Sequence, residues 1–95
     1  MVRQGPAERH TTSKYLLGKC YEQGKGVKQD YAKARSLYEK AAQRTDHVGA
    51  PAMVYLGDMY AKGLGVVVDT AKAKAWYQKA AVTGNLDAIE ALKQM

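Results

Sequence analysis

Small and apolar residues recur at every fourth position in two stretches of the chain. They are Ser13, Leu17 and Tyr21 in the first stretch and Ala52, Leu56 and Tyr60 in the second. Side chains at this spacing share one stripe of an α-helix. After each stretch, apolar residues recur at i, i+3, i+4 and i+7: Ala34, Leu37, Tyr38 and Ala41, then Ala73, Trp76, Tyr77 and Ala80. The pattern predicts two pairs of amphipathic helices, the second helices spanning residues 31–44 and 70–83.

Glycine pairs separate the two helices of each pair. Gly24 and Gly26 follow the first stretch, as Gly63 and Gly65 follow the second, and such glycines are typical of a helix end and a turn. An aspartate follows each pair, at positions 30 and 69. We expect Asp30 and Asp69 to be N-caps, because a carboxylate accepts hydrogen bonds from the free N–H groups of a helix start.

Gly18 and Gly57 lie inside the predicted first helices, where glycine costs about 1 kcal/mol relative to alanine. Close approach of the partner helix would offset that cost.

The chain repeats itself at a spacing of 39 residues. Between residues 17–42 and 56–81, 14 of 26 positions are identical, and a partial third copy begins near Ala88. Helical repeats bury their apolar faces by stacking. We therefore predict a tail over residues 1–10 and a repeat domain over residues 11–95. Its first repeat covers about 11–45, its second about 51–85, and a capping helix about 86–95.

The second unit resembles the Sel1-like repeat family, which is related to tetratricopeptide repeats. The resemblance rests on Ala52, Leu56-Gly57, Tyr60, Gly63-x-Gly65-Val66, Asp69, Ala73, Trp76-Tyr77, Lys79-Ala80-Ala81 and Gly84-Asn85. It covers roughly residues 13–95 and implies an all-α fold, a right-handed α-solenoid whose first helices line a concave groove. Members of the family are typically adaptors, scaffolds or regulatory partners, and some bacterial ones belong to secretion, signalling or toxin-immunity systems.

By the same resemblance, outward positions of the first helices face a partner, which would be a peptide or a helix. These positions include Tyr15, Lys19, Glu22 and Gln23 in the first repeat, Val54, Asp58 and Lys62 in the second, and Asp87 and Glu90 in the capping helix. Tyr15 is the best single anchor, because a rigid aromatic side chain provides contact area at low entropic cost. The alternative is that Tyr15 only packs over the first helix pair.

The turn of the second repeat offers another candidate contact. Val67 and Val68 stand where the first repeat has Lys28 and Gln29. Two valines on an exposed turn would form a small apolar patch, and such patches often mark contacts. Alternatively, these valines cover a neighbouring loop.

Charge and chemistry narrow the possible functions. The net charge is +6 with charges of both signs interspersed, so an acidic protein partner would associate faster. Cys20 is the only cysteine, and neither a metal-ligand cluster nor a catalytic constellation is visible. We expect no metal, cofactor or enzyme activity.

The alternative to a protein-interaction function is nucleic-acid binding through lysines that recur on the second helices: Lys33, Lys40, Lys72 and Lys79.

The cellular setting follows from what the chain lacks. No run of about 18 apolar residues predicts a membrane span, and the first ten residues contain no apolar core of a signal peptide. We expect a cytoplasmic protein, with a mature periplasmic chain as the alternative.

The interaction partner is expected to be another protein. The chain itself is expected to be a monomer or a homodimer.

Overall fold

The computed structural model describes residues 7–44, 46 and 48–95, and the side chains from Lys14 onward. Five helices run along this part of the chain: α1 (Ala7–Gln23), α2 (Tyr31–Ala42), α3 (Ala50–Lys62), α4 (Thr70–Val82) and α5 (Leu86–Lys93). Helix α1 begins inside the segment predicted to be a tail, and residues 1–6 of that segment lie outside the described residues. The second helices α2 and α4 end one or two residues earlier than predicted.

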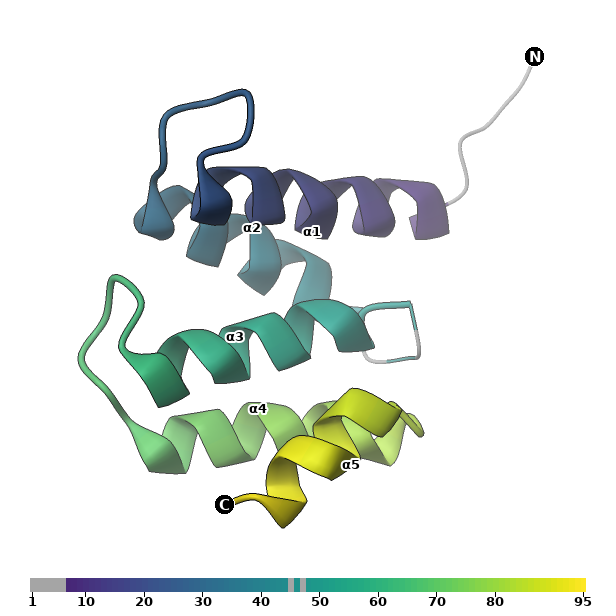
Figure 1. The fold of residues 1–95 in the computed structure, drawn as a ribbon. Helices are drawn as coiled ribbons and strands as arrows, with labels where there is room; N and C mark the ends of the chain where they lie inside the picture. The colour runs from purple at the N-terminus through teal and green to yellow at the C-terminus, as the bar shows by residue number, and fades with distance from the viewer. Residues whose placement is uncertain (1–6, 45, 47) are drawn as a thin grey trace.

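The helices form two stacked hairpins, α1–α2 and α3–α4, and α5 packs against α4 (Figure 1). Helix α2 joins the hairpins, because it packs on α1 and also on α3. The molecule is elongated, with extents of 46 × 32 × 16 Å. This arrangement confirms the predicted α-solenoid of two helix pairs and a capping helix. No helix among the described residues is both long and apolar enough to cross a membrane.

The turns of the two repeats have the same construction. Gly24 and Gly26 have φ angles of 70° and 73°, and Gly63 and Gly65 have 72° and 71°, in the left-handed region that glycine tolerates best. The predicted caps are confirmed: the carboxylates of Asp30 and Asp69 accept hydrogen bonds of 3.0 Å from the backbone N–H three residues later. A repeated sequence therefore produces a repeated turn.

The core lies mainly along α3, which packs against both α2 and α4. Met53, Leu56 and Met59 of α3 and Tyr38 of α2 are the largest fully buried side chains. Leu17 was predicted to share the buried stripe of its repeat, and this is wrong: it is 44% exposed, whereas Leu56 at the same repeat position is 0% exposed. The reason is that α3 packs against both α2 and α4, while the main contacts of α1 are with α2 alone.

The linker between the hairpins is organised by Asp46. Its carboxylate accepts hydrogen bonds from Arg44 Nε at 2.8 and 2.9 Å and from the Val48 N–H at 3.0 Å. Its backbone carbonyl accepts from the Gly49 N–H at 3.1 Å. Pro51 lies in the first turn of α3, where proline is tolerated because its missing N–H has no helical partner.

Candidate functional site

The helices of each hairpin touch where a tyrosine of the second helix lies on a glycine of the first. A Cβ atom added at Gly18 would come within 2.6 Å of Tyr38 Cε1, and one added at Gly57 within 2.5 Å of Tyr77 Cε1. This confirms the predicted close approach at the two glycines. Each phenol ring is thereby buried against the first helix, which leaves its hydroxyl group in need of a polar partner.

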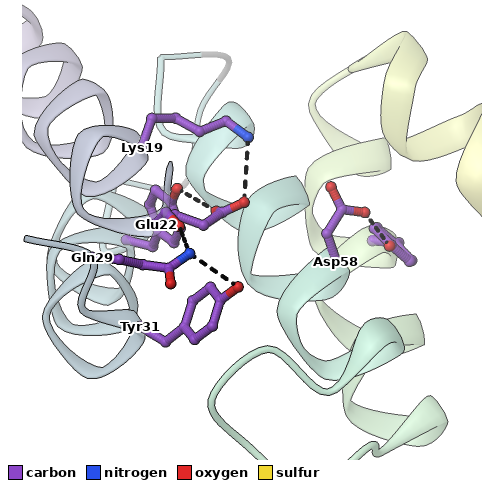
Figure 2. Close-up of polar contacts among 7 residues, drawn as sticks. Lys19, Glu22, Gln29, Tyr31 and Asp58 are labelled. Atoms are coloured by element: carbon purple, nitrogen blue, oxygen red, sulfur yellow. Dashed lines mark hydrogen bonds and ion pairs between the residues drawn. The ribbon is translucent and has the colours of Figure 1, made fainter. Parts of the chain in front are cut away.

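That partner is an acidic residue of the first helix. The Tyr38 hydroxyl donates a 2.7 Å hydrogen bond to Glu22, and the Tyr77 hydroxyl donates one of 2.5 Å to Asp58 (Figure 2). Burial, followed by the hydrogen bond to the acid, raises the pKa of both tyrosines well above its ordinary value. Since both phenols stay neutral, they hold Glu22 and Asp58 in fixed positions.

Tyr55 of α3 packs its ring against tyrosines of both helices of the first repeat. Its ring centroid is 6.0 Å from that of Tyr15 and 5.2 Å from that of Tyr38. The Lys19 ammonium group lies 4.2 Å from the Tyr55 centroid and 3.8 Å from a Glu22 oxygen. We call Tyr15, Lys19, Glu22, Tyr55 and Asp58 the Tyr55 cluster.

The electrostatic surroundings of Tyr55 extend this cluster to α5. Burial raises the pKa of the Tyr55 phenol, and the charges of Tyr15, Asp87, Glu22 and Asp58 raise it further in that order. Three carboxylates thus act on one ring, with Lys19 as the cation against it. The cluster is locally acidic, whereas the whole chain carries a net charge of +6.

The structure brings four of the predicted site residues together in the Tyr55 cluster: Tyr15, Lys19, Glu22 and Asp58. Gln23 and Lys62 are exposed near the ends of α1 and α3. Glu90 is exposed on α5, where it accepts a 3.4 Å hydrogen bond from Gln94.

The prediction for Val54 is wrong, because this side chain is only 8% exposed and belongs to the core. The 39-residue spacing places Val54 opposite Tyr15, and the next residue, Tyr55, reaches the surface instead. Sequence reasoning missed Tyr55. The available signal was chemical, since a phenol favours half-exposed positions and a valine favours buried ones.

The second predicted contact consists of Val67 and Val68. Both valines are exposed as expected, Val67 with 87% of its surface accessible and Val68 with 56%. Both line an open hollow at the turn between α3 and α4. Among the described residues, no group of three His, Cys, Asp or Glu side chains is placed to hold a metal ion.

Comparison with known proteins identifies the repeat. The sequence profile of the Sel1 repeat matches residues 12–46 and 50–81. The structure of a Sel1 repeat protein from Oxalobacter formigenes is 44% identical over 93% of this chain, with a TM-score of 0.79. A protective antigen present in uropathogenic Escherichia coli strains, which displays an SLR fold, is 39% identical over 86% of the chain, with a TM-score of 0.76. None of the curated proteins matches the chain.

Both solved proteins are longer than this chain, which covers 25% of the first and 17% of the second. The two ranges that match the repeat profile take in more than half of the chain. Proteins built from these repeats are typically non-catalytic scaffolds. The chain belongs to the Sel1 repeat family, whose members are generally protein–protein interaction modules.

Proposed function

We propose that the chain is an adaptor that holds a peptide or helix of another protein on the Tyr55 cluster. The observation that supports this best is the position of Tyr55, which lies half-buried between Tyr15 of one repeat and the core of both. Aromatic side chains in partly buried positions are typical centres of protein interfaces. An occupant that spans both repeats would gain contact area without any rearrangement of the helices.

The charges of the cluster favour a particular kind of occupant. Glu22 and Asp58 are held by tyrosine hydroxyls, so their side chains lose little conformational freedom on binding. Asp87 adds a third carboxylate on α5. We therefore propose a segment with an apolar or aromatic side chain over Tyr15 and Tyr55 and a basic side chain beside the acids. This differs from the acidic partner that the net charge alone favours.

An inhibitory partner, of the kind found in toxin-immunity systems, is the other role within this class. The two roles differ in what binding does to the partner. An adaptor leaves the activity of its partner intact and holds a further component, whereas an inhibitor covers an active surface. Affinity capture from a lysate of the source cells, followed by mass spectrometry and an activity assay of the captured protein, would separate the two roles.

Two variants test the surface itself once a partner has been captured. Tyr15→Ala removes an aromatic anchor, and Asp87→Lys reverses an exposed charge of α5 that acts on the Tyr55 phenol. We expect each to weaken binding by about tenfold, the size of an interface residue worth more than 1 kcal/mol. Isothermal titration calorimetry measures the change. Thermal denaturation of each variant shows whether it remains folded.

Glu39→Lys is the matched control, because Glu39 is an exposed acid on α2 that does not belong to the Tyr55 cluster. It is expected to leave the affinity within about twofold, as surface changes outside an interface usually do. If Glu39→Lys weakens binding as much as Asp87→Lys, the Tyr55 cluster is not the binding surface. If it strengthens salt-dependent binding to an oligonucleotide, the exposed lysines of α2 and α4 bind nucleic acid instead.

A further inference from the structure

Each repeat has an open hollow where the turn meets the start of the second helix. Equivalent residues line the two hollows: Tyr21, Val27, Lys28, Gln29, Asp30 and Lys33 in the first repeat, and Tyr60, Val66, Val67, Val68, Asp69 and Lys72 in the second. In both, a lysine ammonium group lies over the tyrosine ring, at 5.4 Å in the first repeat and 5.3 Å in the second. The hollow of the first repeat therefore serves as a reference for the hollow of the second.

The lining differs at the two positions that precede the capping aspartate. In the first repeat, the Gln29 amide donates to the Glu22 carbonyl at 2.8 Å and to the Tyr31 hydroxyl at 3.3 Å (Figure 2). Val67 and Val68 make the corresponding part of the second hollow apolar, and both valines are exposed. Water therefore covers apolar surface in the second hollow, and a ligand that displaces it gains free energy.

The second hollow also spans both repeats. A Cβ atom at Gly65 would collide with the Cβ of Tyr31, so the turn of the second repeat lies against the start of α2. Arg35, one helical turn after Tyr31, consequently lines this hollow together with Lys72. Among the described residues, no carboxylate lies within 4.0 Å of either cation. The Asp69 carboxylate also lines the hollow, but it caps the start of α4.

We propose that the hollow of the second repeat binds an acidic and apolar segment of a partner protein. An aliphatic side chain of the segment lies on Val67 and Val68, and a neighbouring Asp or Glu carboxylate pairs with Arg35 and Lys72. The volume of about 340 Å³ is at the small end of ligand sites, which suits a few side chains rather than a whole helix. This site is separate from the Tyr55 cluster and prefers the opposite charge.

A capped peptide, acetyl-Gly-Glu-Leu-Glu-Gly-amide, serves as the probe, because its amidated end leaves side-chain carboxylates as the only acids. Titration into the nitrogen-15-labelled chain, followed by amide chemical shifts, is expected to give saturable changes at residues 66–72 and at Arg35. Replacing both glutamates with glutamine, or the leucine with alanine, is expected to weaken binding by about tenfold each, because each removes one of the two contacts.

The variant V67Q/V68Q makes the second turn polar, as the first turn is, without adding a charge, and is expected to weaken binding by about tenfold. The first repeat forms the same turn with Lys28 and Gln29, so this variant is expected to fold. The matched control K28A/Q29A changes the other hollow and is expected to bind like the wild type. Unsaturable shifts, equal shifts at both turns, or wild-type affinity in V67Q/V68Q would each overturn the proposal.

Discussion

At the residue scale, the glycine beneath each tyrosine has opposing effects on stability. Gly57 weakens the helix by about 1 kcal/mol relative to alanine. It also makes room for Tyr77, which is only 4% exposed and whose hydroxyl is bound to Asp58. Because the ring is held at both its face and its hydroxyl end, it has little freedom to move away from a larger residue at position 57. Packing therefore outweighs helix propensity at this position.

Gly57→Ala is accordingly expected to destabilise the protein, although alanine is the better helix former. The new Cβ would meet three ring atoms of Tyr77 at 2.5–2.9 Å, and overpacking of this kind costs about 1–3 kcal/mol. Urea denaturation measures the free energy of unfolding. Ala75→Gly, at an exposed position of α4, measures how much unfolding free energy the helix loses when glycine replaces alanine without a change in packing. A Gly57→Ala variant more stable than the wild type would show that the Tyr77 ring can move aside and that the helix propensity of alanine outweighs the packing cost.

At the scale of elements, the sequence predicted the helices, turns and caps well because their signals are local. Glycines with positive φ and aspartate N-caps act within a few residues, so short patterns are enough to identify them. The outward face of α3 was harder to predict. Whether Val54 or Tyr55 reaches the surface depends on how α2 and α4 lie on either side of α3, and a repeat alignment carries no such information.

The linker between the hairpins gives a pH-dependent prediction. The hydrogen bond from Arg44 lowers the pKa of Asp46 below the ordinary value of an aspartate, and the hydrogen bond from the Val48 N–H lowers it further. A carboxyl group with a lowered pKa stabilises the fold above the unfolded-state pKa, and this stabilisation is lost as the pH falls through the folded-state value. Asp46→Asn is therefore expected to lower the melting temperature near neutral pH and to make it less dependent on pH below about 4.

Thermal denaturation followed by circular dichroism between neutral and acidic pH measures both effects. Asp87→Asn is a suitable control, because it also removes one carboxylate but lies outside the linker. Parallel melting curves for Asp46→Asn and the wild type across the acidic range would mean that Asp46 does not couple protonation to folding.

At the scale of the whole molecule, position in the stack determines what a repeated residue does. Leu17 and Leu56 are the same residue at the same repeat position, yet one is 44% exposed and the other is fully buried. In an α-solenoid, each repeat is stabilised by its own contacts and by those with its neighbours. The inner helix α3 has both kinds of contact, whereas α1 packs mainly within its own hairpin. Equal sequences therefore need not contribute equal stability.

The same substitution at these two positions tests this view directly. Leu56→Ala leaves a cavity in the core and is expected to cost about 2–5 kcal/mol of unfolding free energy. Leu17→Ala removes a side chain that already contacts water, and about 1 kcal/mol or less is expected. Urea denaturation of both variants gives the loss of unfolding free energy for the same substitution at two positions of one protein. Equal losses would mean that the exposed face of α1 is covered in solution, for instance by a second copy of the chain, and light scattering of the wild type would then reveal the larger particle.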